Sequence, residues 1–169
     1  KAREAGGYDA LFVAIGAQRG RTLDIPGDGG IAVVNAIDVL RQFEDSADGD
    51  ELNLGPDVVT YGGGNVAMDV ARSAVRLGAA VQMVVLESRE QMPAHDFEVK
   101  EALEEGCQIQ PLRAIKNAID QTISLVEMAL DAQGKPQPTG RFESLQADTV
   151  VLAIGQEVET HLVEGIDGV

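Results

Sequence analysis

The sequence predicts an α/β fold, in which helices flank a parallel β-sheet and a three-stranded antiparallel meander is inserted. Apolar runs of strand length at 58–61 and 81–86 enclose a stretch at 65–77 whose apolar residues recur at helical spacing. A strand, a helix and a second strand so close in the chain form a right-handed crossover, which makes the two strands parallel. The predicted core is therefore a Rossmann-like β-α-β unit.

The helix of this unit is expected to begin at Asn65 and to end at Leu77, because Gly78 is a typical residue after a helix. Its apolar face is predicted to consist of Val66, Val70, Ala74 and Leu77. The face toward solvent is predicted to carry Asp69, Arg72, Ser73 and Arg76.

The segments on either side of this unit continue the alternation. Before it, the expected elements are a buried strand at 10–15, a helix at 31–43 and an exposed acidic loop at 44–51. The apolar face of this earlier helix would be Val33, Ala36, Ile37 and Leu40. After the unit, a helix is expected at 96–105, with Lys100 and Glu104 one turn apart.

Beyond Cys107 the pattern changes to short strands separated by turn residues. The glycine- and proline-containing segments 134–136 and 138–140 are predicted to be turns. The strands of the antiparallel meander are expected at 112–119, 122–130 and 141–145, followed by a last parallel strand at 149–154.

A glycine cluster joins the first strand of the central unit to its helix. The pattern Gly62-x-Gly64-x-x-Ala67 matches the dinucleotide-binding fingerprint, although an ordinary tight turn remains the alternative. Gly62 allows the turn, Gly64 lets the backbone approach a pyrophosphate, and Ala67 lets the helix pack closely on its strand. The first N–H groups of the helix and the positive end of its dipole then face the phosphates.

Glu87 follows the second strand, where the fingerprint places an acid that accepts hydrogen bonds from the adenosine ribose. A carboxylate there repels a 2′-phosphate, so Glu87 favours NAD over NADP; its alternative role is that of a solvated acid. Asp69, one turn into the helix, either orients the nicotinamide half or pairs with Arg72.

Several segments together resemble the small (beta) subunit of glutamate synthase and its relatives, which are FAD-dependent NAD(P)H oxidoreductases with two dinucleotide-binding domains. The resemblance rests on Gly62–Asp69, Arg72, Leu77–Gly78 and Ser88–Ala94. It rests also on two segments that are similar to the family's crossings between its flavin and nucleotide domains. These segments are Tyr8–Ala17, extended by Leu23–Asp28, and Ala147–Gln156.

The resemblance implies that hydride passes from NAD(P)H to FAD, and that electrons continue through iron–sulfur clusters to a large glutamate synthase-type subunit. The chain begins at Lys1 and contains one glycine fingerprint, so we expect it to hold the NAD(P)-binding domain without the flavin domain. The expected divisions are a flavin-domain crossover at 1–29, the NAD(P)-binding domain at 30–156 and a return at 157–169. FAD is then not expected on this chain alone, which is expected to be inactive in isolation.

One departure from the family bears on the cofactor. NADPH-using members carry paired arginines after the second strand, in a Tyr-Arg-Arg-type segment, whereas this sequence has Val85, Leu86 and Glu87. Arg89 remains to stack on adenine or reach a phosphate, but the paired guanidinium groups are missing. NAD(H) is therefore favoured over NADP(H).

Hydride transfer is chemistry of the nicotinamide and the flavin, so no catalytic side chain is expected. The segment Ala153–Gln156 is expected to border the nicotinamide half, because Gly155 leaves room for a ring. The residues predicted to bind the cofactor are Gly62, Gly63, Gly64, Asn65, Val66, Asp69, Glu87, Ser88, Arg89, Ile154, Gly155 and Gln156.

Composition excludes several other classes of function. A net charge of −15 disfavours nucleic acid and anionic membranes as partners, and no apolar run is long enough to span a bilayer. A single cysteine, Cys107, excludes an internal disulfide and suits the cytoplasm; it is expected to pack as a small apolar residue. His95 and His161 lack the spacing of a zinc helix and are expected at the surface, so no metal is predicted.

Three alternatives remain at this point. The same domain could come from a relative that feeds electrons to another acceptor. A methyltransferase-like domain that binds S-adenosylmethionine also has a glycine loop followed by an acid, but it lacks a return segment like Ala153–Gln156. The third alternative is a non-catalytic nucleotide-binding module.

Overall fold

A five-stranded parallel sheet forms the centre of the computed structural model, which describes residues 12–45, 52–159, 161 and 164. The strand order is β2-β9-β3-β4-β5, and every neighbouring pair is parallel. The strands are β2 (Ala32–Asn35), β3 (Asp57–Tyr61), β4 (Ala80–Val84), β5 (Gln108–Gln110) and β9 (Thr149–Leu152). The predicted fold class is confirmed.

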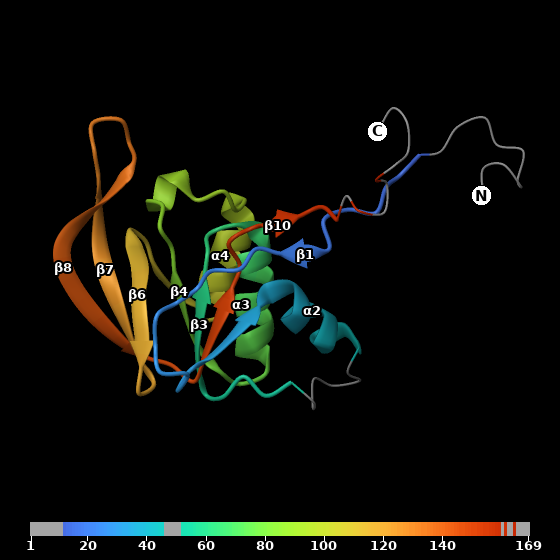
Figure 1. The fold of residues 1–169 in the computed structure, drawn as a ribbon, viewed down its shortest axis with the longest axis horizontal. Helices are drawn as coiled ribbons and strands as arrows, with labels where there is room; N and C mark the ends of the chain where they lie inside the picture. Colours follow the sequence, from blue (N-terminus) through green and yellow to red (C-terminus); the bar gives the residue numbers. More distant parts are fainter. Residues whose placement is uncertain (1–11, 46–51, 160, 162–163, 165–169) are drawn as a thin grey trace, which may run out of the picture.

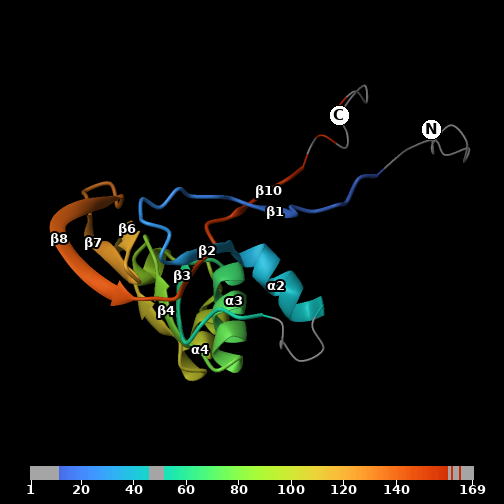
Figure 2. The ribbon, with the colours of Figure 1, turned by 60° about the horizontal axis from the view of Figure 1, so that its bottom comes forward.

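Helices cover one face of this sheet (Figures 1 and 2). They are α2 (Ala36–Asp45), α3 (Asn65–Arg76) and α4 (Asp96–Glu104), and a short 3-10 turn, η1 (Arg89–Gln91), precedes α4. Alternate residues of β3 point to opposite sides: Val58 packs in a core with Met68 and Val70 of α3, while Val59 belongs to the core on the other face.

The other face is covered in part by a three-stranded antiparallel sheet, which makes the molecule three layers deep. Its strands are β6 (Arg113–Ile119), β7 (Thr122–Leu130) and β8 (Pro136–Gln146). Ile123 and Leu125 of β7 are fully buried against Val150 and Leu152 of β9. The inserted meander is therefore confirmed, and it supplies the second hydrophobic core.

The predicted turn at 138–140 is wrong, because these residues lie within β8. The register between β7 and β8 shifts from Val126↔Phe142 to Met128↔Pro138, so Glu127 stands opposite several residues of β8. Gly140 has a positive φ of 84° within this irregularity. The glycine that suggested a turn therefore marks a bulge in a continuous strand.

Two predictions before β3 are also corrected. Residues 12–15 are not a buried strand: they form no regular element, and the Phe12 side chain is 91% exposed, while positions 10 and 11 lie outside the described residues. No strand of the described chain pairs with them, so the apolar run has no sheet to join. The predicted helix at 31–43 divides into β2 and α2, because the β-branched residues of β2 pair with β9 at the sheet edge.

The helix α2 continues to Asp45, so the first two residues of the predicted acidic loop are helical, and positions 46–51 lie outside the described residues. A short antiparallel ribbon, β1 (Arg19–Gly20) with β10 (Gln156–Glu157), and the strand β5 were not predicted. Each is only two or three residues long. Strands of this length lack a readable alternation of apolar and polar residues.

The predicted length of α3 is confirmed to within one residue, but its polar face is not fully exposed. Ser73 is buried and donates to the Asp69 carbonyl oxygen at 2.9 Å. Arg72 does not pair with Asp69; its guanidinium instead reaches Glu98, Glu101 and Glu105 of the α4 region. The packing of α4 against this side of α3 explains both corrections.

The predicted ion pair between Lys100 and Glu104 is present, with 3.6 Å between the Lys100 Nζ and Glu104 Oε1 atoms. Cys107 is buried, as predicted, immediately before β5. No helix among the described residues is long and apolar enough to cross a membrane.

Candidate functional site

The glycine turn between β3 and α3 approaches neighbouring backbone and side-chain atoms too closely for larger residues. The Gly62 N–H donates to the Val84 carbonyl oxygen at 3.0 Å, and its φ of 141° is one that side chains disfavour. A Cβ atom on Gly62 would lie 2.3 Å from the Ala153 carbonyl oxygen, and one on Gly63 would lie 2.7 Å from Val85 Cγ1. The turn thus requires glycine at both positions.

At Gly64 the reason for glycine is different. The nearest atom to a Cβ there is Pro93 Cγ, at an ordinary contact distance of 3.9 Å. The protein itself therefore leaves space at Gly64, which is compatible with the predicted approach of a ligand to the backbone.

The helix α3 begins at this turn without a side-chain cap, because its N-cap residue is Gly64. The Ala67 and Met68 N–H groups donate to the Gly64 carbonyl oxygen, at 2.9 and 3.2 Å. Among the described residues, no acceptor receives the N–H groups of Gly64, Asn65 or Val66. Ala67 is fully buried, as its role in close helix–strand packing predicts.

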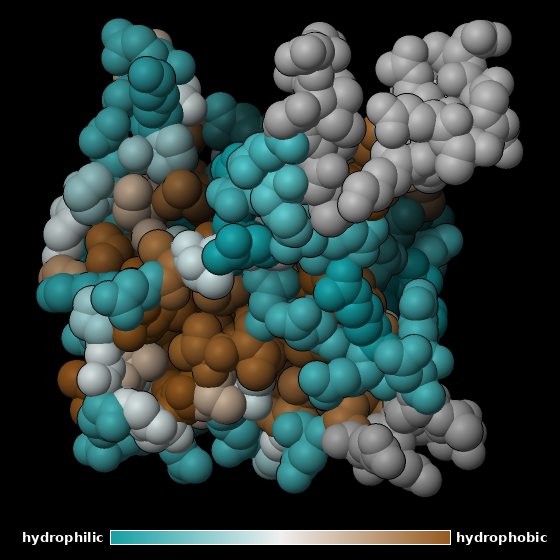
Figure 3. All heavy atoms as spheres, turned by 45° about the vertical axis from the view of Figure 1, so that its right-hand side comes forward, coloured by the Kyte–Doolittle hydropathy of each residue, from teal (hydrophilic) through white to brown (hydrophobic). Residues whose placement is uncertain are grey.

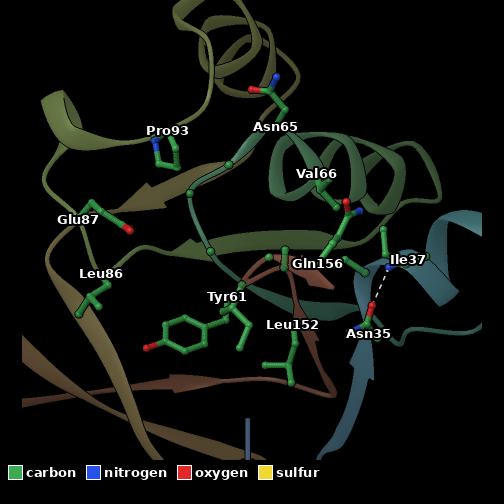
Figure 4. A pocket seen from close by; sticks show the side chains of 17 residues that line it. Asn35, Ile37, Tyr61, Asn65, Val66, Leu86, Glu87, Pro93, Leu152 and Gln156 are labelled. Carbon is green, nitrogen blue, oxygen red and sulfur yellow. Dashed lines mark hydrogen bonds between the residues drawn. The ribbon is translucent and has the colours of Figure 1, made fainter. Parts of the chain in front are cut away.

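A cavity of about 590 Å³ opens beside the turn, at the carboxyl ends of the parallel strands (Figure 4). Asn35, Leu152 and Tyr61, the last residues of β2, β9 and β3, all line it. Ligands of doubly wound sheets bind at this edge. The remaining lining residues are Ala36, Ile37, Gly62, Gly63, Gly64, Asn65, Val66, Leu86, Glu87, Pro93, Ala153, Ile154, Gly155 and Gln156.

Glu87 is the one residue with a full charge among those that line the cavity. It is half-buried, and its side chain turns toward the glycine turn in Figure 4. The Glu87 Oε2 atom lies 3.6 Å from the position that a Cβ on Gly63 would take. Among the described residues, no lysine or arginine lines the cavity, so an anion bound there would depend on backbone N–H groups.

Tyr61 contributes an uncharged aromatic wall to the same cavity. Burial raises the pKa of the Tyr61 phenol above its ordinary value, and the nearby Glu87 carboxylate raises that pKa further. The phenol is consequently neutral at physiological pH, and Glu87 supplies the local charge.

The segment after β9 borders the opposite side of the cavity. Ile154, Gly155 and Gln156 all line it, and Gly155 has a φ of 110°. The Gly155 carbonyl oxygen accepts a hydrogen bond from the Arg21 N–H at 2.9 Å. The cavity therefore lies between the glycine turn and the segment predicted to border the nicotinamide.

Of the residues predicted to bind a cofactor, nine line this cavity: Gly62, Gly63, Gly64, Asn65, Val66, Glu87, Ile154, Gly155 and Gln156. Three do not. Asp69 is exposed further along α3; Ser88 is buried and donates to Glu90 Oε2 at 2.9 Å; and an Arg89 guanidinium nitrogen lies 4.0 Å from Met92 Sδ. The cofactor role of these three side chains stays a prediction.

Sequence reasoning missed the second strand-to-helix junction at the cavity. Asn35 ends β2, and its side-chain oxygen accepts a hydrogen bond from the Ile37 N–H at 3.0 Å. The signal is present in the sequence, because an asparagine directly before a helix is a common N-cap, but the apolar spacing of 31–43 predicts one continuous helix. The lining residues not predicted are Asn35, Ala36, Ile37, Tyr61, Leu86, Pro93, Leu152 and Ala153.

His95 and His161 are both exposed, and His95 stacks on Phe97 with 5.6 Å between ring centroids. Among the described residues, no group of three or more histidine, cysteine or acidic side chains is arranged to hold a metal ion.

A family model described as pyridine nucleotide-disulphide oxidoreductase matches residues 1–168. The chain belongs to this family. Its sequence resemblance to the glutamate synthase small subunit and related oxidoreductases is also confirmed. With one cysteine in its sequence, the chain itself forms no internal disulfide.

Two of the similar curated proteins are named as subunits of oxidoreductases. The chain is 36% identical over 179 residues to the NADPH-Fe(3+) oxidoreductase subunit beta of Geobacter sulfurreducens, covering 95% of the chain and 26% of that protein. It is 32% identical over 170 residues to the glutamate synthase (NADPH) small chain of Azospirillum brasilense, and this match covers 89% of the chain and 35% of that protein. The chain thus spans well under half the length of these relatives.

Solved structures with a similar fold have low sequence identity. A 2-naphthoyl-CoA reductase matches 96% of the chain and 22% of its own, with a TM-score of 0.67 at 20% identity. Thioredoxin reductase from Giardia duodenalis matches 84% of the chain and 42% of its own, with a TM-score of 0.59 at 20% identity. At this identity the likeness concerns the fold alone.

Proposed function

We propose that residues 30–156 are the NAD(P)-binding domain of a flavin-dependent oxidoreductase, and that this domain presents NADH for hydride transfer to FAD held elsewhere. Residues 1–29 and 157–169 then connect it to a flavin domain of the same polypeptide. The observation that carries the proposal is the cavity in which the glycine turn, the start of α3, Glu87 and residues 154–156 meet.

The arrangement matches a dinucleotide along its length. The N–H groups of Gly64, Asn65 and Val66 have no protein acceptor among the described residues and suit a pyrophosphate. Glu87 suits the adenosine ribose, and Gly155 lines the end of the cavity proposed for the nicotinamide, where Arg21 Cδ lies 3.6 Å from the position that a Cβ on Gly155 would take. Because residues 154–156 line the same cavity, this proposal is favoured over a methyltransferase-like site.

The preference for NADH rests on the charge of the cavity. In the part of the chain that the structure describes, the one fully charged lining residue is an acid, Glu87, and no lysine or arginine lines the cavity to bind a 2′-phosphate. The relatives from Geobacter and Azospirillum carry NADPH in their names. We therefore propose that this chain differs from them in cofactor, through Glu87.

Exposed apolar side chains support a contact with a further domain. Figure 3 shows apolar residues gathered in the middle of one face of the molecule. Val33, in the edge strand β2, is 43% exposed, and Leu23, which precedes this strand, is 40% exposed. We propose that the flavin domain packs near β2, and that partner subunits and iron–sulfur clusters receive the electrons.

The test is a titration of the chain with NADH and with NADPH, followed by calorimetry or by fluorescence. NADH should bind more tightly, and Glu87→Arg should shift the ratio of the two dissociation constants toward NADPH by about 1–3 kcal/mol. Glu104→Arg is the matched control, because it makes the same charge change on an exposed side chain of α4, outside the cavity. A wild-type preference for NADPH, or equal shifts in both variants, contradicts the assignment of Glu87.

A further inference from the structure

The glycine turn is held by the segment Met92–His95, which leads from η1 into α4 and whose Pro93 lines the cavity. The Ala94 N–H donates to the Gly63 carbonyl oxygen at 3.1 Å. The next N–H, that of His95, donates to the Asn65 side-chain oxygen at 3.0 Å. Two adjacent donors of this segment therefore bind acceptors on the turn and on the first residue of α3.

The hydrogen bond to Gly63 also determines the direction of the next amide. A trans peptide unit points its C=O and its N–H to opposite sides, and no cis peptide occurs in the described residues. Because the Gly63 carbonyl points to Ala94, the Gly64 N–H of the same unit points away from Ala94. Gly64 lines the cavity, and this N–H has no protein acceptor among the described residues.

The Asn65 side chain strengthens the same contact. It does not cap its own helix, since the N-cap is Gly64. In Figure 4 its amide turns away from Tyr61 and Leu152. Its oxygen instead accepts from His95, the N-cap residue of α4, and so ties the start of α3 to the start of α4.

Packing supports this interpretation of the segment. The Met92 and Ala94 side chains are each only 8% exposed, and Met92 Cγ lies 3.5 Å from the position of a Cβ on Gly63. The cavity residue Glu87 lies five residues before Met92, in the same connection between β4 and α4. The connection between β4 and α4 thus contacts the site at both its ribose end and its phosphate end.

We propose that Asn65 is a positioning residue for pyrophosphate binding, which acts through His95 and not through its own contact with the ligand. It holds Met92–His95 against the turn, and the Ala94 hydrogen bond then keeps the Gly64 N–H directed at the pyrophosphate. The inference rests on the proposed dinucleotide function. It assigns to the side chain of Asn65 a role distinct from that of its backbone.

The test compares ligands with and without the pyrophosphate. In Asn65→Ala, the affinity for NADH and for ADP-ribose should fall about tenfold, while the affinity for adenosine stays within twofold of wild type. The control is Asn53→Ala, which removes a side-chain acceptor of the Gly55 N–H at the amino end of the sheet. This control should leave all three affinities unchanged.

Equal losses for all three ligands in Asn65→Ala, or no loss for NADH, overturn the proposal. A second measurement uses the wild type, so it does not depend on whether the variant folds. In NMR spectra, ADP-ribose should shift the Gly64 amide resonance strongly, whereas adenosine should not. If ADP-ribose does not shift the Gly64 amide resonance, the proposal is also overturned. If the wild type binds neither NADH nor ADP-ribose, the proposed function itself has failed, which is a separate outcome.

Discussion

Two strand-to-helix junctions border the same cavity, and they are built in opposite ways. The junction β3–α3 turns on three glycines and leaves the first N–H groups of its helix without a side-chain acceptor. At the junction β2–α2, the Asn35 side chain accepts the Ile37 N–H. Among the described residues, a side chain therefore accepts one N-terminal donor of α2 and none of α3, although both helices begin at the cavity, so the start of α3 is the better site for an anion.

The packing around the two junctions also differs: one junction is open to a ligand, and the other anchors a neighbouring segment of the chain. Gly62 and Gly63 are pressed against backbone and side chains of neighbouring strands, so they serve the shape of the turn. The Asn35 side chain donates to the Arg21 carbonyl oxygen at 3.3 Å and lies where a Cβ on Gly20 would be. The junction β2–α2 therefore anchors the chain near β1, while β3–α3 is open to a ligand.

The largest expected effect comes from Gly62→Ala, which places a Cβ against the Ala153 carbonyl oxygen and moves the turn. NADH affinity should fall by about 2–3 kcal/mol, roughly a hundredfold, as measured by calorimetry. The control is Gly78→Ala, at the other end of α3, where φ is also positive at 93° but no atom lies within 4 Å. Both variants should lose stability through backbone strain, but a matching loss of affinity in Gly78→Ala would falsify the special role of the turn.

A smaller effect is expected at the second junction. Asn35→Ala removes the cap of α2 and should lower the free energy of unfolding by about 1 kcal/mol, measured with urea. NADH affinity should fall much less than in Gly62→Ala, because Asn35 lines the cavity but its cap is not a predicted phosphate donor. Asn35→Asp, which keeps the acceptor, should restore most of the stability. A loss of NADH affinity as large as that of Gly62→Ala would show that the two junctions act alike.

The smallest effect on binding is expected at the far end of α3, where Glu105 bridges Arg72 and Arg76. These guanidinium groups lower the pKa of Glu105 from 4.5 to about 2. A carboxyl group whose pKa is lower in the folded state stabilises the fold above its unfolded pKa, and this stabilisation is lost as pH falls from about 4.5 toward 2.

The free energies of unfolding of wild type and Glu105→Gln, measured with urea, should therefore differ most near pH 6 and converge as the pH approaches 2. NADH affinity at pH 7 should be the same in both proteins. The exposed neighbour Glu104, which pairs only with Lys100 among the ion pairs found, provides the control variant Glu104→Gln, whose stability should follow that of wild type. If the free energies of unfolding of Glu105→Gln and wild type differed by the same amount at every pH, the ion-pair explanation would be contradicted.

Local pattern was sufficient to predict α3, the meander and most of the glycine turn. These features depend on neighbours in the chain: Gly62 and Gly64 define the turn, and the spacing of Val70 and Ala74 defines the buried face of the helix. The short apolar runs after Cys107 indicate the meander, although the turn predicted at 138–140 lies within β8. The acid at position 87 was predicted for the site from the same fingerprint, and it lines the cavity.

Sequence alone could not decide contacts between segments that are distant in the chain. Pairing with β9 made residues 32–35 a strand, a bulge opposite Glu127 kept 138–140 in β8, and α4 drew Arg72 away from Asp69. The contact of Met92–His95 with the glycine turn depends likewise on how the β4–α4 connection folds back. Which residues form the turn follows from backbone sterics, but what holds it and faces its ligand follows from three-dimensional packing.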